Sequence, residues 1–440
     1  MERTELLARI RAAGIVGAGG AGFPTHVKLN CQAEVVIANA AECEPLLRSD
    51  RLLMEREAGK VILGLKLAMQ AAGASRGVIA IKQKYYKAIA ALEQAITPGD
   101  SITLYLMASF YPAGDEQQIV YEVTGQVVPT GGLPLDVGAV VQNVATLMHI
   151  ADSAEGLPML DKYVTVTGAV SDPAVFIAPV GTSVRQLINA AGGPKDLAYY
   201  TVMIGGPVMG RVMEELDEPV TKTTGGILVF PSDHPLVRKR CGTAEVDLKL
   251  AKSVCCQCNL CTMMCPRNAL GLKVEPNKIM RALAMNAPEG MGEVNGIFSC
   301  CDCGICTLFA CNFDLAPSRM MSRVKQQLLK DGIRPVKRIA YAVGENINDI
   351  KVPVSRLMKR LSLDQYDRDL PLRTDIGPVT AVRLPLKMHI GQPARPVIRS
   401  GERVERGQLI AAVAEGLGAH VHASISGVAT LFDGYIEIQG

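Results

Sequence analysis

The sequence predicts a multidomain protein of mixed α/β and α+β class, and three observations support this. In the N-terminal third, apolar runs typical of strands alternate with helical stretches such as AGKVILGLKLAMQAAG. Ten of the thirteen cysteines lie between Cys255 and Cys311, which marks a separate unit. From about residue 379 the chain reads as short strands separated by glycine turns. With 440 residues, 48% of them hydrophobic, the chain can form several buried cores.

Composition excludes several classes of protein. The formal net charge of +3 and the charged fraction of 20% argue against a nucleic-acid-binding protein. No apolar run reaches the ~18 residues that a membrane-spanning helix needs, and the N-terminus has no apolar signal core. We therefore expect a cytoplasmic protein with no membrane span. In such a chain, cysteines in tight groups are more often metal ligands than disulfide partners.

The stretch GAGGAGFPTHVK, from Gly17 to Lys28, contains the spacing G-x-G-x-x-G. That spacing indicates a dinucleotide-binding loop only when a strand precedes it and a helix opens at its end. Here TELLARIRAAG, which has helical periodicity, precedes the loop, and Pro24 follows it almost at once. A standard dinucleotide fingerprint and a flexible turn remain alternatives. We favour a third interpretation, in which bare backbone approaches a phosphorylated ligand by the geometry of another fold.

Polar side chains follow three apolar runs in the N-terminal region. VVIANAAECEP ends in Asn39, Glu42 and Glu44, and the turn after SITLYLMA contains Gly114-Asp115-Glu116. The run VGAVVQNVATLMHI contains Asn143 and Thr146. Because open α/β sheets bind ligands at the carboxyl ends of their strands, we expect these groups to line a site. Each acid taken alone could equally be a solvated turn residue.

The first cysteine motif, CCQCNLCTMMCP, has the spacing C-x2-C-x2-C-x3-C followed by proline, which is typical of bacterial [4Fe–4S] ferredoxins. The second motif, CCDCGICTLFAC, has one more residue in its last gap and Asn312 in place of the proline. A zinc site is the competing interpretation, but zinc ligands typically come as two separated pairs. We therefore predict two [4Fe–4S] clusters.

In two-cluster ferredoxins the fourth cysteine of each motif binds the other cluster. This rule assigns Cys255, Cys258, Cys261 and Cys311 to one cluster, and Cys300, Cys303, Cys306 and Cys265 to the other. Cys256 and Cys301 are expected to pack near the cluster sulfurs. The isolated cysteines Cys31, Cys43 and Cys241 are expected to be inert.

GAGGAGFPTHVK, NAAECEP, YPAGDE and QNVATL resemble the flavin-binding segments of the complex I NADH-binding flavoprotein subunit. The resemblance implies a Rossmann-like domain that binds FMN and NADH without the usual fingerprint. Gly114-Asp115-Glu116 departs from the paired glutamates of complex I at Asp115. The residues implied to contact FMN or NADH are Gly17, Gly19, Gly20, Gly22, Phe23, Lys28, Asn39, Glu42, Glu44, Gly114, Asp115, Glu116, Asn143 and Thr146.

The remaining segments resemble domains found in the same families. The expected domains are an FMN/NADH-binding domain at 1–155, a β-grasp SLBB domain at 160–232, a dicluster ferredoxin-like domain at 245–332, a linker at 333–378 and a C-terminal barrel-sandwich hybrid domain at 379–440. The central hairpin of the last domain, HASISGVA, lacks the lysine of biotinyl and lipoyl carriers, so carrier function is not expected. Its histidines, His389, His420 and His422, are interpreted as structural residues rather than metal ligands.

The whole chain resembles the C protein of the Rnf complex and the cobalamin reductases of propanediol-utilisation microcompartments. In the Rnf protein the sandwich domain comes first, whereas in the reductases it comes last, as here. The resemblance implies a cytoplasmic NADH-oxidising enzyme that is part of a larger complex or of a bacterial microcompartment. Electrons would pass from NADH through FMN and two [4Fe–4S] clusters to a corrinoid. Two alternatives are an Rnf-C-like module that serves another partner reductase and a non-catalytic ferredoxin-like adaptor.

Overall fold

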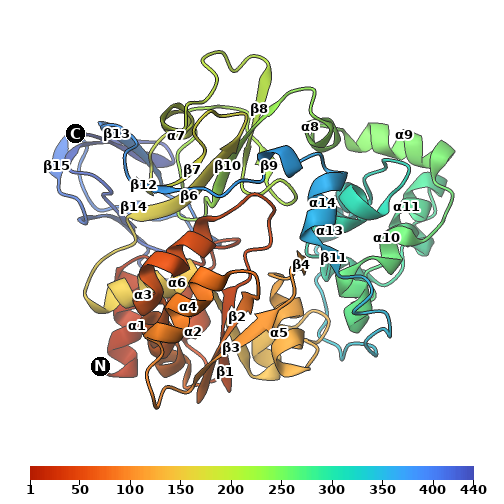
Figure 1. The fold of residues 1–440 in the computed structure, drawn as a ribbon, viewed down its shortest axis with the longest axis horizontal. Helices are drawn as coiled ribbons and strands as arrows, with labels where there is room; N and C mark the ends of the chain where they lie inside the picture. The colour runs from red at the N-terminus through yellow and green to blue at the C-terminus, as the bar shows by residue number, and fades with distance from the viewer.

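The fold is described from a computed structural model of residues 1–440. Figure 1 shows the N-terminal domain and the C-terminal domain on one side of the molecule and the cysteine-rich domain on the other. The second domain of the chain lies above the N-terminal domain in this view. None of the helices has the length and apolar character that crossing a membrane requires.

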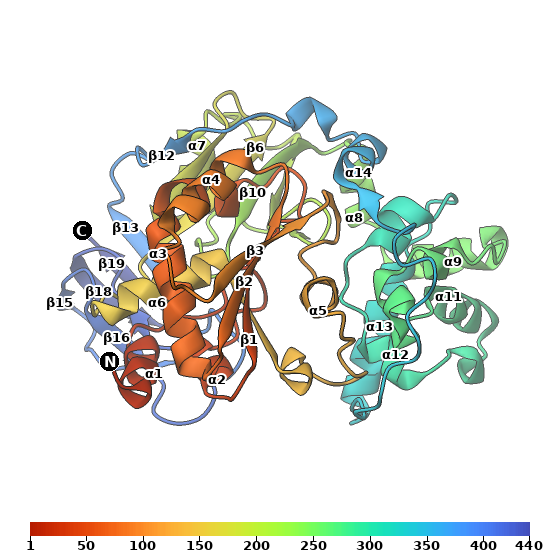
Figure 2. The same cartoon turned by 60° about the horizontal axis from the view of Figure 1, so that its bottom comes forward.

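The N-terminal domain is built on a parallel sheet of order β3-β2-β1-β5. Helices α3 and α6 cover one face of the sheet and α5 covers the other, as Figure 2 shows. The expected alternation of strands and helices is therefore confirmed. The elements are α1 (Arg3–Ala12), α2 (Thr25–Leu29), β1 (Val35–Ala40), α3 (Ser49–Ala72), β2 (Arg76–Lys82), α4 (Tyr86–Ala95), β3 (Ile102–Met107), β4 (Phe110–Tyr111), α5 (Glu116–Thr124), β5 (Ala139–Asn143) and α6 (Val144–Ala154).

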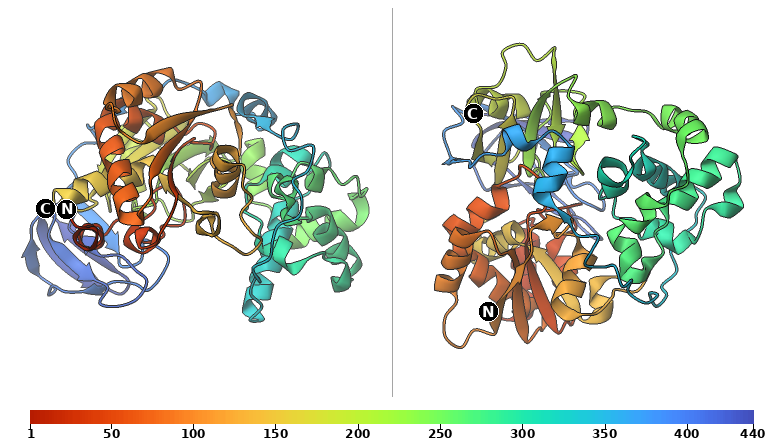
Figure 3. Two further views of the ribbon diagram at one scale, coloured as in Figure 1. Left: turned by 90° about the horizontal axis from the view of Figure 1, so that it is seen from below. Right: turned by 45° about the vertical axis from the view of Figure 1, so that its right-hand side comes forward.

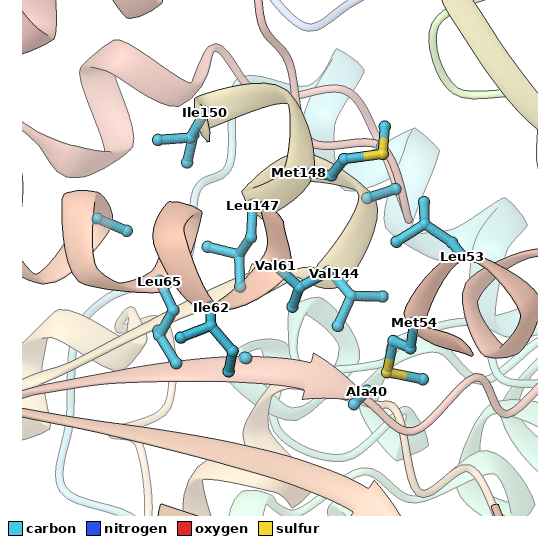
Figure 4. Packing of buried hydrophobic residues seen from close by; sticks show 14 of the residues in the cluster. Ala40, Leu53, Met54, Val61, Ile62, Leu65, Val144, Leu147, Met148 and Ile150 are labelled. Atoms are coloured by element: carbon cyan, nitrogen blue, oxygen red, sulfur yellow. The ribbon is translucent and has the colours of Figure 1, made fainter. Parts of the chain in front are cut away.

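The contact between α3 and α6 forms the centre of the largest core. Figure 4 shows Leu53, Val61 and Leu65 of α3 facing Val144 and Leu147 of α6. The helices approach so closely at Gly64 that a Cβ there would lie 1.9 Å from the carbonyl oxygen of Leu147. This packing fixes the start of α6, and with it the end of β5, relative to the sheet.

The second domain has a mixed six-stranded sheet of order β12-β7-β6-β10-β8-β9. Helix α7 packs on it through a core that includes Val184, Leu187 and Ile188. Asp172 and Pro173 lie in the turn between β6 and β7. The elements are β6 (Asp161–Gly168), β7 (Ala174–Pro179), α7 (Val184–Ala190), β8 (Tyr200–Ile204), β9 (Arg211–Val212) and β10 (Gly226–Pro231).

The cysteine-rich domain is helical, and its core of sixteen buried residues includes Cys265 and packs against Cys255, Cys300 and Cys311. The basic amphipathic stretch SRMMSRVKQQLLK belongs to α13, which packs on this core through the buried Met320, Met321, Val324 and Leu328. The elements are α8 (Pro235–Arg240), which leads into the domain, α9 (Ala244–Val254), α10 (Leu260–Met263), α11 (Pro276–Met285), α12 (Val294–Phe298) and α13 (Pro317–Lys330).

The segment expected as a linker is structured and returns across the molecule. Its strand β11 (Val352–Pro353) pairs with β4 of the N-terminal domain, and β12 (Leu372–Arg373) extends the sheet of the second domain. Between them lies α14 (Val354–Arg360). The segment is therefore a strap that ties three domains together, and Figure 3 shows it crossing between them.

The C-terminal domain packs two antiparallel sheets, of order β13-β19-β18-β15 and β14-β16-β17, around a common core. This arrangement confirms the predicted short strands and glycine turns. The elements are β13 (Ala381–Pro385), β14 (Arg395–Pro396), β15 (Glu402–Val404), β16 (Leu409–Ala412), β17 (Val421–His422), β18 (Gly427–Phe432) and β19 (Tyr435–Gln439).

Candidate flavin and iron–sulfur sites

The glycine loop joins α1 to α2 and lies over the end of β5. It closes as a small hairpin, because the Gly17 amide donates to the carbonyl of Phe23 at 2.9 Å. The Ala18 amide donates to Oγ1 of Thr146 at 2.9 Å. A Cβ on Gly19 would lie 2.7 Å from Nδ2 of Asn143. The loop expected to contact a ligand is therefore adjacent to Asn143 and Thr146, as the resemblance implied.

The glycines of this loop have different surroundings. A Cβ on Gly20 would meet no atom within 4 Å, so this part of the loop faces open space that a ligand could fill. Gly22 has φ +73°, and a Cβ there would lie 3.0 Å from Cγ2 of Thr223 and from Cα of His389. The absence of a side chain at Gly22 therefore also allows the loop to pack closely against the second and C-terminal domains.

Two acidic residues, Glu42 and Asp50, lie next to the glycine loop. Oε1 of Glu42 accepts hydrogen bonds from Oγ of Ser49 at 2.9 Å and from the amide of Asp50 at 3.2 Å. Its Oε2 is buried and has no partner in the protein. Asp50 in turn accepts from Nδ2 of Asn143 at 2.7 Å. Burial, together with the charge of Glu42, raises the pKa of Asp50 to about 7.

The sequence interpretation missed Asp50 and the buried Lys162. Asp50 is the second residue of α3 and follows the NAAECEP segment by five residues, so a helix-start signal at Ser49-Asp50 could have drawn attention to it. Lys162, on β6 of the second domain, interacts with Asp50 electrostatically, and burial lowers its pKa to about 8. No local sequence pattern identifies Lys162 as a site residue, because it belongs to another domain.

Four further predicted residues, in two contacting pairs, lie at the neighbouring edge of the sheet. Nζ of Lys28, on α2, lies 2.6 Å from Oε1 of Glu116 at the start of α5. Nδ2 of Asn39 donates to the carbonyl of Gly114 at 3.0 Å, which fixes the turn before α5 to the end of β1. Both members of the Lys28–Glu116 pair are partly exposed, at 30% and 40%, and Phe23 is exposed nearby in sequence.

Two of the predicted acidic site residues, Glu44 and Asp115, bind to other domains. Glu44 accepts hydrogen bonds from the amides of Val208 and Met209 in the second domain, both at 2.9 Å. Burial raises the pKa of Glu44 to about 7. Asp115 forms a two-pronged ion pair with Arg267 of the cysteine-rich domain, with N–O distances of 2.8 and 2.6 Å. These two acids connect domains, and the structure does not place them in the open space beside Gly20.

The cysteines Cys255, Cys258, Cys261 and Cys311, here called the outer set, line one pocket. The same pocket is lined by Cys256 and by apolar side chains that include Leu260 and Phe313. Burial raises the pKa of Cys261 to about 12, and the other three thiols of the set add to the effect, which shows that all four lie close together. The fold thus brings Cys311 to the first motif, as the crossover rule predicts.

The cysteines Cys265, Cys300, Cys303 and Cys306, here called the inner set, are also close to one another. Cys265 and Cys300 interact electrostatically, and Cys306 interacts with both. Cys265, Cys303 and Cys306 are buried. The inner set lies against the N-terminal domain, because the hydroxyl of Tyr111 donates to the carbonyl of Cys303 at 2.8 Å.

The donor sets fit the groups that the sequence suggested. Each set supplies four thiols from two segments of chain, and soft thiolate ligands select iron–sulfur clusters or zinc. At the other site, the open space at Gly20 and the unpartnered Glu42 oxygen suit a bound polar ligand. Two of the three C-terminal histidines accept hydrogen bonds from the backbone: Nε2 of His389 from the amide of Ala419 at 3.0 Å, and Nδ1 of His420 from that of Val413 at 3.2 Å. Nδ1 of the third, His422, is buried and has no hydrogen-bond partner.

Four family models match the chain in the order in which the domains occur. They are described as the Nuo51 FMN-binding domain over residues 10–152, the SLBB domain over 163–212, a 4Fe-4S dicluster domain over 254–316 and the RnfC barrel sandwich hybrid domain over 367–434. The expected four-domain fold is therefore confirmed. The chain has an FMN-binding domain and a domain for two 4Fe-4S clusters.

Curated relatives match over most of the chain. Cobalamin reductase PduS of Salmonella typhimurium is 41% identical over 428 residues, which cover 96% of this chain and 94% of that protein. Cobalamin reductase PduS of Citrobacter freundii is 40% identical over 431 residues, covering 96% and 93%. The C protein of the Na(+)-translocating ferredoxin:NAD(+) oxidoreductase complex of Acetobacterium woodii is 40% identical over 260 residues, covering 58% and 56%.

Proposed function

The chain belongs to the family of cobalamin reductase PduS, and from this we propose that it oxidises NADH and delivers single electrons to a corrinoid. The proposed route runs from NADH through FMN and two [4Fe–4S] clusters to the corrinoid. FMN, when bound, accepts a hydride and releases single electrons, whereas each cluster carries one electron at a time. The remaining chemistry of the chain is binding and orientation.

The observation that carries the proposal is the arrangement of the two cysteine sets relative to the N-terminal domain. Cys303 of the inner set contacts Tyr111, which follows β3 of that domain. The outer set lies farther along the cysteine-rich domain, where Cys258 is exposed. A mostly buried thiol set that contacts the N-terminal domain, and a second set with one exposed thiol, support a route from NADH to an external acceptor.

Within the N-terminal domain, we assign the nucleotide-binding role to residues around the open space at Gly20. The glycine loop offers backbone amides, and Lys28 offers a cation for a phosphate. Glu42 and Asn143 are proposed to orient polar groups of the ligand, because Asn143 lies beside Gly19 and is connected to Glu42 through Asp50. Asp115 and Glu44 serve this site by fixing the adjoining domains.

The main alternative to a corrinoid as the electron acceptor is a partner enzyme. The similarity to the C protein of the Acetobacterium woodii complex over 58% of the chain favours, as a second candidate, a module that passes NADH electrons to another partner enzyme. A non-catalytic adaptor is the third possibility, and it would need neither FMN nor NADH. We further propose that the protein works in the cytoplasm as part of a larger assembly, with a bacterial microcompartment as one setting.

The test is anaerobic purification followed by assays of FMN, iron and electron transfer. We expect about one FMN and about eight iron atoms per chain, as two cubanes require. NADH should drive reduction of both an artificial dye and cob(III)alamin. Dye reduction without corrinoid reduction would favour the partner-enzyme alternative. Absence of FMN and of NADH-dependent dye reduction would favour the adaptor.

A further inference from the structure

We propose that the ion pair between Arg267 and Asp115 sets the reduction potential of the cluster bound by the inner set. Arg267 is a positioning residue in this proposal and does not bind the cluster. The inference rests on the proposed function, because it needs a cluster at the inner set. It goes further by assigning a role to two side chains that neither donate a thiolate nor face the open space at Gly20.

The geometry places this ion pair between two domains and beside the inner set. Arg267 follows Cys265 by two residues, and its Nη1 donates to the carbonyl of Ser299 at 3.4 Å, directly before Cys300. Its charge also acts on Cys301 and Cys303. On the other side, Asp115 accepts the guanidinium through both carboxylate oxygens and caps α5 by accepting from the amide of Gln118. One charged pair thus touches the segments of both inner-set motifs and the flavin-type domain.

Burial makes these charges effective. The side chains of Arg267 and Asp115 are 10% and 8% exposed. By contrast, the neighbouring pair of Lys325 and Asp302 is 26% and 47% exposed, so water screens it more strongly. Charges in a dry, low-dielectric region interact over longer distances than surface charges do.

The two charges act on the inner set with opposite sign, so removal of either one leaves the other unbalanced. Reduction adds a negative charge to a cluster. An uncompensated Arg267 therefore stabilises the reduced form and raises the reduction potential, whereas an uncompensated Asp115 lowers it. A purely structural role predicts no such opposition of sign, because both substitutions would loosen the same contact.

The experiment is an anaerobic redox titration of the full-length protein, followed by the electron paramagnetic resonance signals of the reduced clusters. Asp115→Asn keeps an N-cap residue and a hydrogen-bond acceptor but removes the charge. We expect it to raise the potential of the inner-set cluster by an amount equivalent to about a tenfold change in the equilibrium constant, which is about 59 mV for one electron. Arg267→Gln should lower that potential, and Arg267→Lys should restore most of it.

A matched control is Asp247→Asn. Asp247 is a buried carboxylate that pairs with Arg319 in the same domain, and its substitution should leave the inner-set potential unchanged. Shifts of the same sign in Asp115→Asn and Arg267→Gln, or no shift in either, would overturn the proposal. If Arg267→Gln loses iron, Asp115→Asn decides alone: an upward shift supports the proposal, and a downward shift or none overturns it. Wild-type protein that binds no clusters would instead contradict the proposed function itself.

Discussion

The two cysteine sets arise from nearly the same motif but have different surroundings. In the inner set, Cys265, Cys303 and Cys306 are buried, and Tyr111 and Arg267 connect the set to the N-terminal domain. In the outer set no cysteine is buried, and Cys258 is exposed. In the proposed electron route, position in the fold, and not the motif, would therefore decide which cluster receives electrons from the flavin and which one gives them to the acceptor.

The largest expected effect comes from removing one ligand of each set. Cys265→Ser should lose the cluster of Cys300, Cys303 and Cys306, although Cys265 belongs to the first motif in sequence. Cys258→Ser should lose the other cluster. Each variant should retain about four iron atoms per chain and one of two distinct spectroscopic signals. If Cys265→Ser and Cys258→Ser lost the same signal, the crossover assignment would be wrong.

A second pair of variants compares two glycines of the loop. Gly20→Val fills space that holds no protein atom, so it should abolish FMN binding while iron content and thermal stability stay near wild type. Gly22→Val must clash with Thr223 and the His389 backbone in a left-handed conformation, so it should also lower the melting temperature. FMN content and thermal unfolding measure the two effects. Full flavin occupancy in Gly20→Val would show that the loop has another purpose.

A smaller effect concerns pH. Burial raises the pKa of Glu44 to about 7 from its ordinary value of 4.5, so the folded protein keeps a proton that the unfolded chain loses between these two values. The contribution of Glu44 to stability is therefore fully present below about pH 4.5 and declines as the pH rises to about 7. Glu44→Gln should show a shallower decline, by at most about 1.4 kcal/mol per pH unit. Thermal unfolding from pH 5 to 8 measures it, and parallel curves for the two proteins would contradict it.

The smallest expected effect is that of Tyr111→Phe. This change removes the hydroxyl that donates to the carbonyl of Cys303, and a hydrogen bond of this kind contributes about 1 kcal/mol. We expect a modest fall in the melting temperature and faster loss of the inner-set cluster, with the outer-set cluster unaffected. The rate of cluster loss to an iron chelator measures this effect. Equal acceleration at both sets would show that Tyr111 stabilises the domain generally.

The sequence predicted what local spacing determines. The cysteine motifs identified both thiol sets, and the alternation of apolar runs and helical stretches identified the strands of the N-terminal sheet, whose ends hold Asn39 and Asn143. Contacts between distant segments could not be predicted in this way. Asp115 lies 152 residues from its partner Arg267, and Lys162 reaches Asp50 from another domain. Residues 333–378, which form the strap, were expected to be a linker. Their two short strands pair only with segments far away in the sequence, so no local pattern predicted them.

The most direct test of the account is NADH-driven reduction of cob(III)alamin by wild-type protein and by Cys303→Ser, with matched FMN content. Serine keeps the backbone carbonyl that Tyr111 contacts but removes an inner-set thiol. We predict that the wild type reduces both the corrinoid and a two-electron dye, and that the variant reduces only the dye. Corrinoid reduction by Cys303→Ser at the wild-type rate would contradict the claim that electrons leave the flavin through the inner set.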